Sequence, residues 1–203
     1  MIADHHGPVA GVVLAAGAST RMGRNKLLLT IEGESVLRRA ARRALDAGLD
    51  PVIVVLGHEA ERTRQELAGL GCRVVVNADH PKGQTTSLRA GIAALPAGVA
   101  AAVVVLADMP FVTSAMLAAL VQRFRGGDTP LVISDYDGVT APPMLYARAL
   151  FPKIEAMEGD SCGKRVVKAH RGEAAVLSWP AGALSDLDVP DDYDRALGRL
   201  AVR

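Results

Sequence analysis

The sequence has few aromatic residues and no charge excess, and each shortage excludes a class of protein. Aromatic residues make up 3% of the 203 residues, too few for the stacking platforms that bind single-stranded nucleic acids. The formal net charge is +1, whereas a surface dedicated to nucleic acids or anionic membranes needs a clear basic excess. We therefore expect neither a nucleic acid nor a membrane as a partner.

Cysteines and long apolar runs are also scarce. The two cysteines, Cys72 and Cys162, are far apart and belong to no C-x-x-C pattern, so we expect free thiols in a reducing compartment. The N-terminal apolar run is about nine residues long, too short to span a membrane. Asp4 stands where a signal peptide has basic residues, so we expect a soluble cytoplasmic protein.

Apolar residues make up half of the chain and occur in short runs that alternate with helical patterns. Continuous β-branched runs predict buried strands, and apolar residues three or four apart predict helices. Strands are predicted at 9–14, 51–56, 73–76, 101–107, 131–134, 144–146 and 174–177. This alternation predicts a three-layer, Rossmann-like α/β fold with a doubly wound, mainly parallel sheet and helices on both faces.

Several local features are predicted from the same patterns. The arginines of the first helix, at 36–45, are expected to form a solvated face. Thr140–Pro143 is expected to form a turn, and Asp160 to cap a helix that buries Val166 and Val167. The last helix is expected to bury its apolar stripe, which consists of Tyr193, Leu197 and Leu200.

The most informative stretch, Leu14–Lys26, follows the first predicted strand. Small residues at 15–19 allow a ligand to approach the backbone closely, and Arg21 and Lys26 add two cations at the same place. Exposed amides and cations directly after a strand form a cradle for a polyphosphate. An ordinary glycine-containing turn is the alternative, but it would not explain the two cations.

The glycine spacing differs from two common phosphate loops. A P-loop needs G-x-x-x-x-G-K-[ST], but Gly17 and Gly23 are too far apart and Lys26 comes three residues after the second glycine. A dinucleotide fingerprint needs a glycine where this chain has Ser19. A nicotinamide-dependent oxidoreductase is therefore disfavoured.

Two other segments lie at predicted strand ends. Asp108 follows the most apolar predicted strand. There its charge needs a partner, and a Mg²⁺ ion that bridges carboxylates and substrate phosphates would supply one. The alternative is that Asp108 caps the next turn. Residues 82–87 offer amides and hydroxyls at the start of a helix. There Thr85 or Thr86 could cap the helix while its neighbours bind a ligand.

Leu14–Lys26 resembles the L-A-A-G-x-S-x-R-M-G-x-x-K signature of nucleotidyltransferases similar to the molybdenum cofactor cytidylyltransferases. Further similarities extend over nearly the whole chain. Residues 77–88 resemble the family segment N-P-x-x-x-x-G-x-x-x-S-L, residues 106–110 the L-A-D-M-P motif, and residues 186–193 the segment D-I-D-T-P-E-D-Y.

This resemblance implies a nucleotidyltransferase that moves a nucleoside monophosphate from a nucleoside triphosphate, preferably CTP, to molybdopterin or its molybdenum cofactor and releases pyrophosphate. It implies catalytic roles for Arg21, Lys26 and Asp108, and a Mg²⁺ site, with Mn²⁺ as an alternative, at Asp108 and Asp188. The implied nucleotide-binding residues are Leu14, Ala15, Ala16, Gly17, Ala18, Ser19, Arg21, Met22, Gly23, Lys26, Asn77, Gly83, Gln84, Thr85 and Ser87.

The resemblance also predicts how the chain is divided. We expect one domain over 1–203, with a nucleotide-binding half at about 8–130 and a half at about 131–203 that binds the acceptor and supplies the second metal ligand. A monomer is expected, with transient contact to a molybdoenzyme as the partner that receives the product.

The acceptor is less well defined than the transfer. Ala15-Ala16 is similar to the cytidylyl branch, but Thr140–Pro143 and Asp160–Lys164 depart from the family pattern where the acceptor is expected. Arg148, Lys164 and Arg165 are candidate acceptor-binding cations, or simply a solvated basic rim. Guanylyl transfer, another phosphorylated acceptor and a nucleotide-binding regulator without turnover stay open as alternatives.

Overall fold

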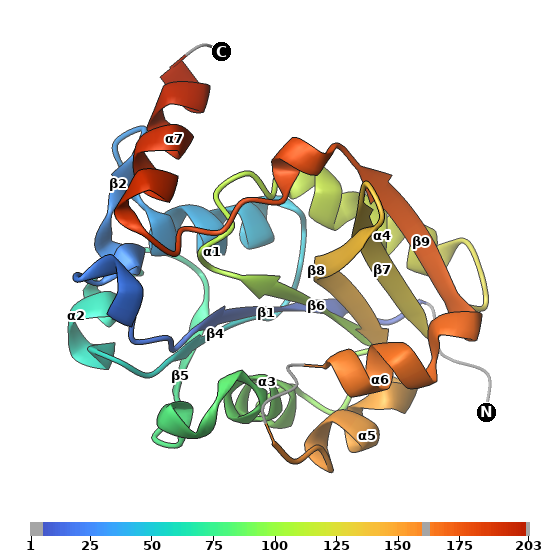
Figure 1. Ribbon diagram of the computed structural model, residues 1–203. Coiled ribbons are helices and arrows are strands. Elements are labelled where there is room, and N and C mark those ends of the chain that lie inside the picture. Colours follow the sequence, from blue (N-terminus) through green and yellow to red (C-terminus); the bar gives the residue numbers. More distant parts are fainter. Residues whose placement is uncertain (1–5, 160–162, 202–203) are drawn as a thin grey trace.

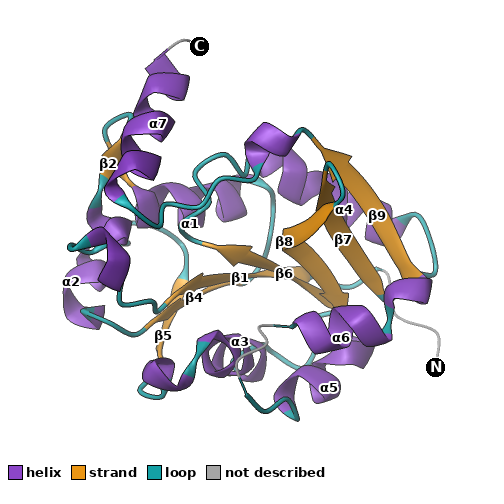
Figure 2. Cartoon of the chain, in the orientation of Figure 1, coloured by secondary structure: helices purple, strands orange, loops and turns teal. Residues whose placement is uncertain are grey.

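The computed structural model describes residues 6–159 and 163–201, shown as coloured ribbons in Figures 1 and 2. The strands are β1 (Val9–Ala15), β2 (Thr30–Ile31), β3 (Glu34–Ser35), β4 (Val52–Leu56), β5 (Arg73–Val76), β6 (Ala101–Leu106), β7 (Leu131–Tyr136), β8 (Val139–Ala147) and β9 (Ala174–Trp179). The α-helices are α1 (Val36–Asp46), α2 (Ala60–Gln65), α3 (Gln84–Ala93), α4 (Ser114–Arg125), α5 (Phe151–Glu155), α6 (Lys164–Ala169) and α7 (Pro190–Ala201). Among the described residues, no helix combines the length and the apolar character needed to cross a bilayer.

A seven-stranded sheet forms the centre of the fold, in the order β5-β4-β1-β6-β8-β7-β9. Neighbouring strands are parallel except where β8 pairs with β6 and β7. A separate antiparallel hairpin joins β2 and β3. The predicted doubly wound, mainly parallel sheet is confirmed.

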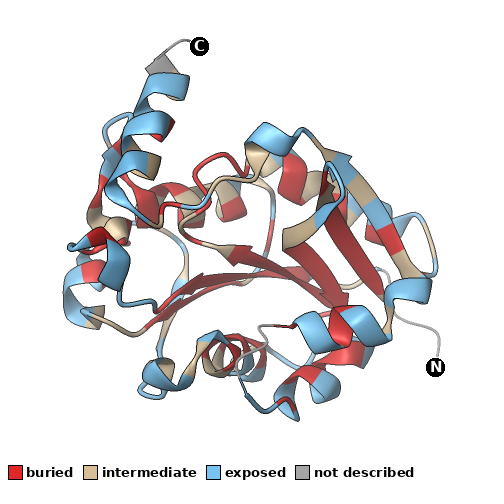
Figure 3. Ribbon diagram, in the orientation of Figure 1, coloured by how far each residue is buried: buried red, intermediate tan, exposed pale blue. Residues whose placement is uncertain are grey.

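Helices cover both faces of this sheet, as Figure 1 shows. Along β1, Val9 and Val13 pack with α1 and α4, whereas Val12 and Leu14 pack with α3, α5 and α6. This alternation follows from the two-residue period of a strand. All of β1 is buried, and the central strands are red in Figure 3, as expected for a sheet that is covered on both sides.

Parallel pairing brings several strand ends to the same edge of the sheet. Leu14 of β1 lies in register with Val55 of β4 and with Leu106 of β6, so the loops that follow these strands meet. Gly57 follows β4 at this edge, and a Cβ atom there would lie 2.8 Å from the Ala16 Cβ and 2.7 Å from the His80 ring. The absence of a side chain at Gly57 therefore lets three loops approach one another closely.

Some local predictions are wrong. Thr140–Pro143 lies inside β8 rather than in a turn, because residues 139–141 pair with β7. In the last helix Tyr193 and Leu200 pack against the core as expected, but Leu197 is 38% exposed and Ala196 is buried in its place. Helix α6 begins at Lys164 and buries Val166 and Val167, and the predicted cap Asp160 lies outside the described residues.

The arginine-rich face of α1 is only partly solvated. Arg38 and Arg42 keep contact with solvent and pair with Glu34. Arg39 is buried, and Arg43 Nη1 donates to the backbone carbonyls of Pro110 and Val112 at 2.6 and 2.5 Å. The loop that follows β6 covers these side chains, and charge spacing within the helix gives no sign of it.

Burial lowers the pKa of the Arg43 guanidinium without removing its charge at neutral pH. Removal from water and the nearby charges of Arg39 and Arg42 lower the pKa of its guanidinium to about 10. The group is still protonated at neutral pH, so a charged donor holds the loop after β6. Charge-assisted hydrogen bonds of this kind are stronger than neutral ones.

The packing of α3 on the sheet predicts a clear effect of one methyl group. In Gly91→Ala the new Cβ would overlap Val12 Cγ1 and lie 3.1 Å from Val55 Cγ2. Overpacking of a core typically costs about 1–3 kcal/mol, and the gain in helix propensity of up to about 1 kcal/mol offsets only part of this cost, so the free energy of unfolding should fall in a urea titration. The matched control is Gly198→Ala in α7, where nothing lies within 4 Å; it should be neutral or stabilising by up to about 1 kcal/mol. Equal stabilities of the two variants would contradict the described packing of α3.

Candidate active site

The loop after β1 is held in a defined conformation by its own polar groups. Ser19 has φ of 52° and Gly23 has φ of 70°, and a short 3-10 helix, Thr20–Met22, lies between them. Ser19 Oγ accepts a hydrogen bond from the Lys26 backbone N–H at 3.2 Å, which closes the loop. Asn25 Oδ1 accepts from the Leu27 N–H at 3.1 Å and starts the next 3-10 turn. The loop is therefore shaped before any ligand binds.

Two cations of this loop meet two carboxylates from other parts of the chain. Lys26 Nζ donates to Asp108 Oδ2 and, at 3.1 Å, to Asp188 Oδ1. Arg21 Nη2 lies 2.9 Å from Asp188 Oδ2. The side chains of Lys26 and Asp108 are 12% and 19% exposed, so this ion pair is shielded from bulk solvent. The structure thus brings together the predicted residues Arg21, Lys26, Asp108 and Asp188.

Backbone hydrogen bonds fix the segments that carry the carboxylates. The Ala107 N–H donates to Leu14 O, and the Leu187 N–H donates to Asp108 O, both at 3.1 Å. Asp192 Oδ2 accepts from the N–H groups of Asp188 and Val189 at 2.9 Å each, at the start of α7. Asp188 is therefore held beside Asp108 by main-chain contacts as well as by Lys26.

The charges in the site perturb one another. Burial alone would lower the pKa of Lys26, but Asp108 and Asp188 outweigh it, so the pKa of the ammonium is raised above its usual value. A third carboxylate, Asp186, faces the same cleft. Desolvation and the like charges of Asp108 and Asp188 raise the pKa of Asp186 to about 6. A shift of this size is typical of functional sites.

These groups line a cavity of about 350 Å³. The predicted nucleotide-binding residues in its lining are Leu14, Ala15, Ala16, Gly17, Ser19, Arg21, Lys26, Gln84 and Ser87. Asp108 and Asp188 also line it. The small residues and the cations predicted from the loop therefore share one cavity with the carboxylates.

Other predicted nucleotide-binding residues lie behind this lining. Met22 packs in the core, Thr85 is buried at 2% exposure, and Gly83 precedes α3 with φ of 111°. Asn77 is buried, and its Nδ2 donates to Thr86 Oγ1 at 2.8 Å and to Ser87 Oγ at 3.0 Å. Ala18 and Gly23 belong to the loop but are not among the lining residues. For Asn77 and Met22 the described contacts are structural.

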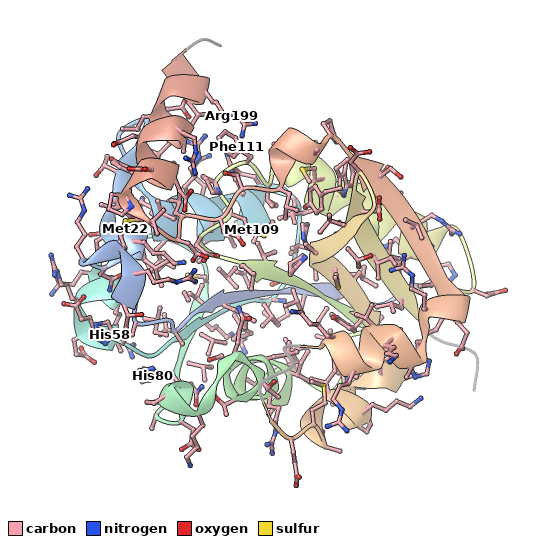
Figure 4. The ribbon with its side chains drawn as sticks, in the orientation of Figure 1. Met22, His58, His80, Met109, Phe111 and Arg199 are labelled. Atoms are coloured by element: carbon pink, nitrogen blue, oxygen red, sulfur yellow. The ribbon has the colours of Figure 1, made fainter. Side chains whose placement is uncertain are left out.

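Five of the lining residues were not predicted: Thr20, Leu27, His80, Leu106 and Asp186. His80 follows β5 and approaches Gly57, and its ring centroid lies 6.4 Å from that of His58. Figure 4 shows the two histidines on the same side of the molecule. Asp186 comes two residues before the predicted metal ligand Asp188. The repeated carboxylates of residues 186–188 were the available signal for Asp186, whereas nothing in the sequence distinguished His80 from an ordinary loop histidine.

A second cavity of about 670 Å³ adjoins the first and shares Gln84, Leu106 and Asp186 with it. Its remaining lining residues are Thr140, Ala141, Pro142, Met144, Lys164, Val167, Lys168 and Arg171. The larger cavity is therefore formed mainly by the start of β8 and by α6, both from the second half of the chain.

The structure separates the three predicted acceptor-binding cations. Lys164 lines the larger cavity. Arg165 lies on another side of α6, in a separate hollow with Lys153 and His170. Arg148 donates to the backbone carbonyls of Pro96 and Val99 at the opposite end of the sheet from Asp108. Arg148 and Arg165 thus do not line the cavities that adjoin the carboxylate cluster, and of the three candidates for binding the acceptor only Lys164 does.

The carboxylate pair fits a divalent cation. A single ammonium, Lys26 Nζ, contacts both Asp108 and Asp188, so their oxygens already converge on one position for positive charge. Among the described residues, no group of three or more His, Cys, Asp or Glu side chains could hold a metal ion. Two carboxylates completed by phosphate oxygens and water are the donor set that Mg²⁺ prefers.

A family model and several known proteins match this chain. The model of the MobA-like NTP transferase domain matches residues 11–175. The chain is 34% identical over 199 residues to the purine catabolism protein PucB of Bacillus subtilis, with 91% of this chain and 93% of that protein covered. It is 33% identical over 195 residues to a probable molybdenum cofactor guanylyltransferase of Opitutus terrae, with 92% and 94% covered.

The fold of this chain is also similar to that of a solved structure. The crystal structure of Rv0371c from Mycobacterium tuberculosis superposes with a TM-score of 0.84 at 30% identity and covers 95% of this chain and 98% of that one. The same protein in complex with manganese gives a TM-score of 0.79, with 94% and 98% covered. The residues that the family model matches include β1 from Gly11 onward, the loop with Lys26, and Asp108. The chain therefore belongs to the MobA-like NTP transferase family and is a nucleotidyltransferase.

Proposed function

We propose that this protein transfers a cytidylyl group from CTP to the phosphate of an acceptor, most suitably molybdopterin or its molybdenum cofactor, and releases pyrophosphate. The observation that supports this proposal best is the convergence of Arg21, Lys26, Asp108 and Asp188 on one cavity that has a floor of small residues. The adjoining larger cavity offers space for an acceptor next to the phosphates.

The proposed chemistry needs positioning and charge more than a protein base. An acceptor phosphate with a second pKa of about 6 is largely ionised at pH 7, so its oxygen can attack the α-phosphorus directly. The new O–P bond forms as the bond to the leaving pyrophosphate breaks. Lys26 and Arg21 would offset the charge that develops on the phosphates. In this account catalysis rests on positioning and electrostatic stabilisation.

Asp108 and Asp188 would hold a divalent cation, for which Mg²⁺ is proposed and Mn²⁺ is the alternative. When bound, such an ion supplies positive charge to the α-phosphate region. Manganese in the related Rv0371c structure supports a divalent ion in this family. The protein's own contribution is to fix the two carboxylates through Leu187 and Asp192.

The choice of CTP rests on Ala16, which stands where guanylyl transferases of the family usually have glycine. Ala16 is 6% exposed and lines the smaller cavity, so its methyl group reduces the space beside the loop. The similarity to a probable guanylyltransferase makes guanylyl transfer the second candidate. PucB, a purine catabolism protein, supports a third candidate, in which another phosphorylated compound or a related cofactor is the acceptor.

Calorimetric titration with Mg²⁺ present tests the base. CTP should bind more tightly than GTP or ATP, because the Ala16 methyl group leaves too little room for a purine. Ala16→Gly should narrow the difference between CTP and GTP. A preference of the wild-type protein for GTP or ATP would contradict the cytidylyl assignment.

Lys26→Ala tests the role of the loop cation. Removal of one electrostatic group that stabilises a transition state typically costs about 10²-fold or more in turnover, and we expect a loss of that size in a pyrophosphate-release assay. The control is Arg24→Ala, which removes a cation of the same loop that is not among the residues lining the cavity. Wild-type turnover in a folded Lys26→Ala protein would remove Lys26 from the mechanism.

Asp108→Asn and Asp188→Asn test the metal site while conserving side-chain size. Each change should weaken Mn²⁺ binding, measured by electron paramagnetic resonance. Because both groups would bind one ion, the free energy of Mn²⁺ binding that the double variant loses should be smaller than the sum of the losses in the two single variants. Asp46→Asn, on the exposed end of α1, serves as the control and should bind Mn²⁺ normally. Additive losses would mean that Asp108 and Asp188 act separately.

A further inference from the structure

The larger cavity has a cluster of cations that the proposed chemistry does not use. Lys164 and Lys168 lie one turn apart on α6, so their side chains project from the same helix face. Arg171 follows α6, and its Nη1 donates to Thr140 Oγ1 at 2.6 Å, which fixes the guanidinium beside the start of β8. We call Lys164, Lys168 and Arg171 the rim cations.

The rim cations have no carboxylate partner among the described residues. The ion pairs of the described chain involve none of these three side chains. All three are exposed to solvent. Most other arginines and lysines near the active site, such as Lys26 and Arg21, are instead paired with carboxylates. Unpaired like charges at the mouth of one cavity repel one another, and an anion would relieve this repulsion.

The cavity has two different ends. Gln84, Leu106 and Asp186 are shared with the smaller cavity and define the end next to the nucleotide site. The rim cations belong to the other lining residues, together with an apolar wall formed by Ala141, Pro142, Met144 and Val167. A ligand that fills the cavity would therefore place one end near Lys26 and Asp108, its body against an apolar wall, and its other end among the rim cations.

We infer that the acceptor has a second anionic group besides the phosphate that attacks CTP, and that Lys168 and Arg171, with Lys164, bind this second group. The inference rests on the proposed function, since it treats the larger cavity as the acceptor site. The attacking phosphate belongs at the shared end, which opens toward the smaller cavity that Lys26 and Arg21 line. An acceptor whose only anionic group is the attacking phosphate would leave the rim cations without a partner, whereas an acceptor with anionic groups at both ends matches the charges of the cavity.

A pair of small probes tests this without any turnover. Phenyl phosphate and 4-carboxyphenyl phosphate share an apolar body and a phosphate but differ by one anionic group. We expect the carboxylated probe to bind the wild-type protein about threefold to tenfold more tightly in calorimetric titrations, which is the effect of about one partly shielded ion pair. Added salt should reduce this difference in affinity between the two probes, because salt screens exposed charges.

The Lys168→Ala and Arg171→Ala variants should bind the two probes equally. The control is Arg125→Ala, which removes an exposed cation at the end of α4 that lines neither cavity. This variant should show the same difference in affinity between the probes as the wild-type protein. Equal binding of both probes to the wild-type protein would overturn the inference, and so would an unchanged difference in the double variant Lys168→Ala/Arg171→Ala. Failure of both probes to bind would overturn it as well.

A second arm separates this inference from the proposed function. With CTP and molybdopterin as substrates, Arg171→Ala should raise KM for the acceptor while kcat and the affinity for CTP are retained, because the rim cations lie away from the reacting phosphates. If cytidylyl transfer is absent but the two probes still differ in affinity, the anion site is supported and the proposed reaction is wrong. If transfer occurs and the acceptor KM is unchanged in Arg171→Ala, the second anionic group is not bound there.

Discussion

The contact of Lys26 with both Asp108 and Asp188 is the interaction on which the site depends. It joins the loop after β1, the end of β6 and the segment before α7, which are far apart in the sequence but meet at one edge of the sheet. Each carboxylate is also positioned by the main chain, through Leu187 N–H to Asp108 O and through the cap of α7 at Asp192. The C-terminal helix is anchored independently: Tyr193 Oη donates to Thr30 O at 2.6 Å, and the guanidinium carbon of Arg199 lies 3.9 Å from the centroid of the Phe111 ring. Figure 4 labels both side chains, which lie near α7.

In the proposed reaction, this arrangement would allow nucleotidyl transfer without a nucleophilic side chain. The strands supply rigid ends, the small residues of the loop allow phosphates to approach the backbone, and the ion-pair network keeps opposite charges close before substrate binds. Preorganised charge costs little reorganisation during the reaction. Arg43 supports the same end of the sheet from the opposite face, since its buried guanidinium holds the carbonyls of the loop that follows Asp108.

Much of this could be predicted from the sequence because the decisive signals are local. The β-branched runs gave β1, β4, β5 and β6 almost to the residue, and the small residues with two cations marked the loop that lines the cavity. The features that could not be predicted depend on contacts between distant segments. The burial of Arg39 and Arg43 depends on which loop covers α1, and the placement of Arg148 depends on the antiparallel direction of β8. Asp186 was within reach of sequence reasoning, but only the fold shows that it faces both cavities.

The most direct test of the account is a crystal structure of the protein with Mn²⁺ and α,β-methylene-CTP, a nucleotide that cannot be cleaved at the transferred phosphate. We expect an anomalous peak that places a manganese ion within bonding distance of both Asp108 and Asp188. The triphosphate should lie along residues 15–19, and Lys26 Nζ should contact the phosphates instead of the carboxylates. A manganese peak away from this pair, or a nucleotide bound while Lys26 still bridges Asp108 and Asp188, would contradict it.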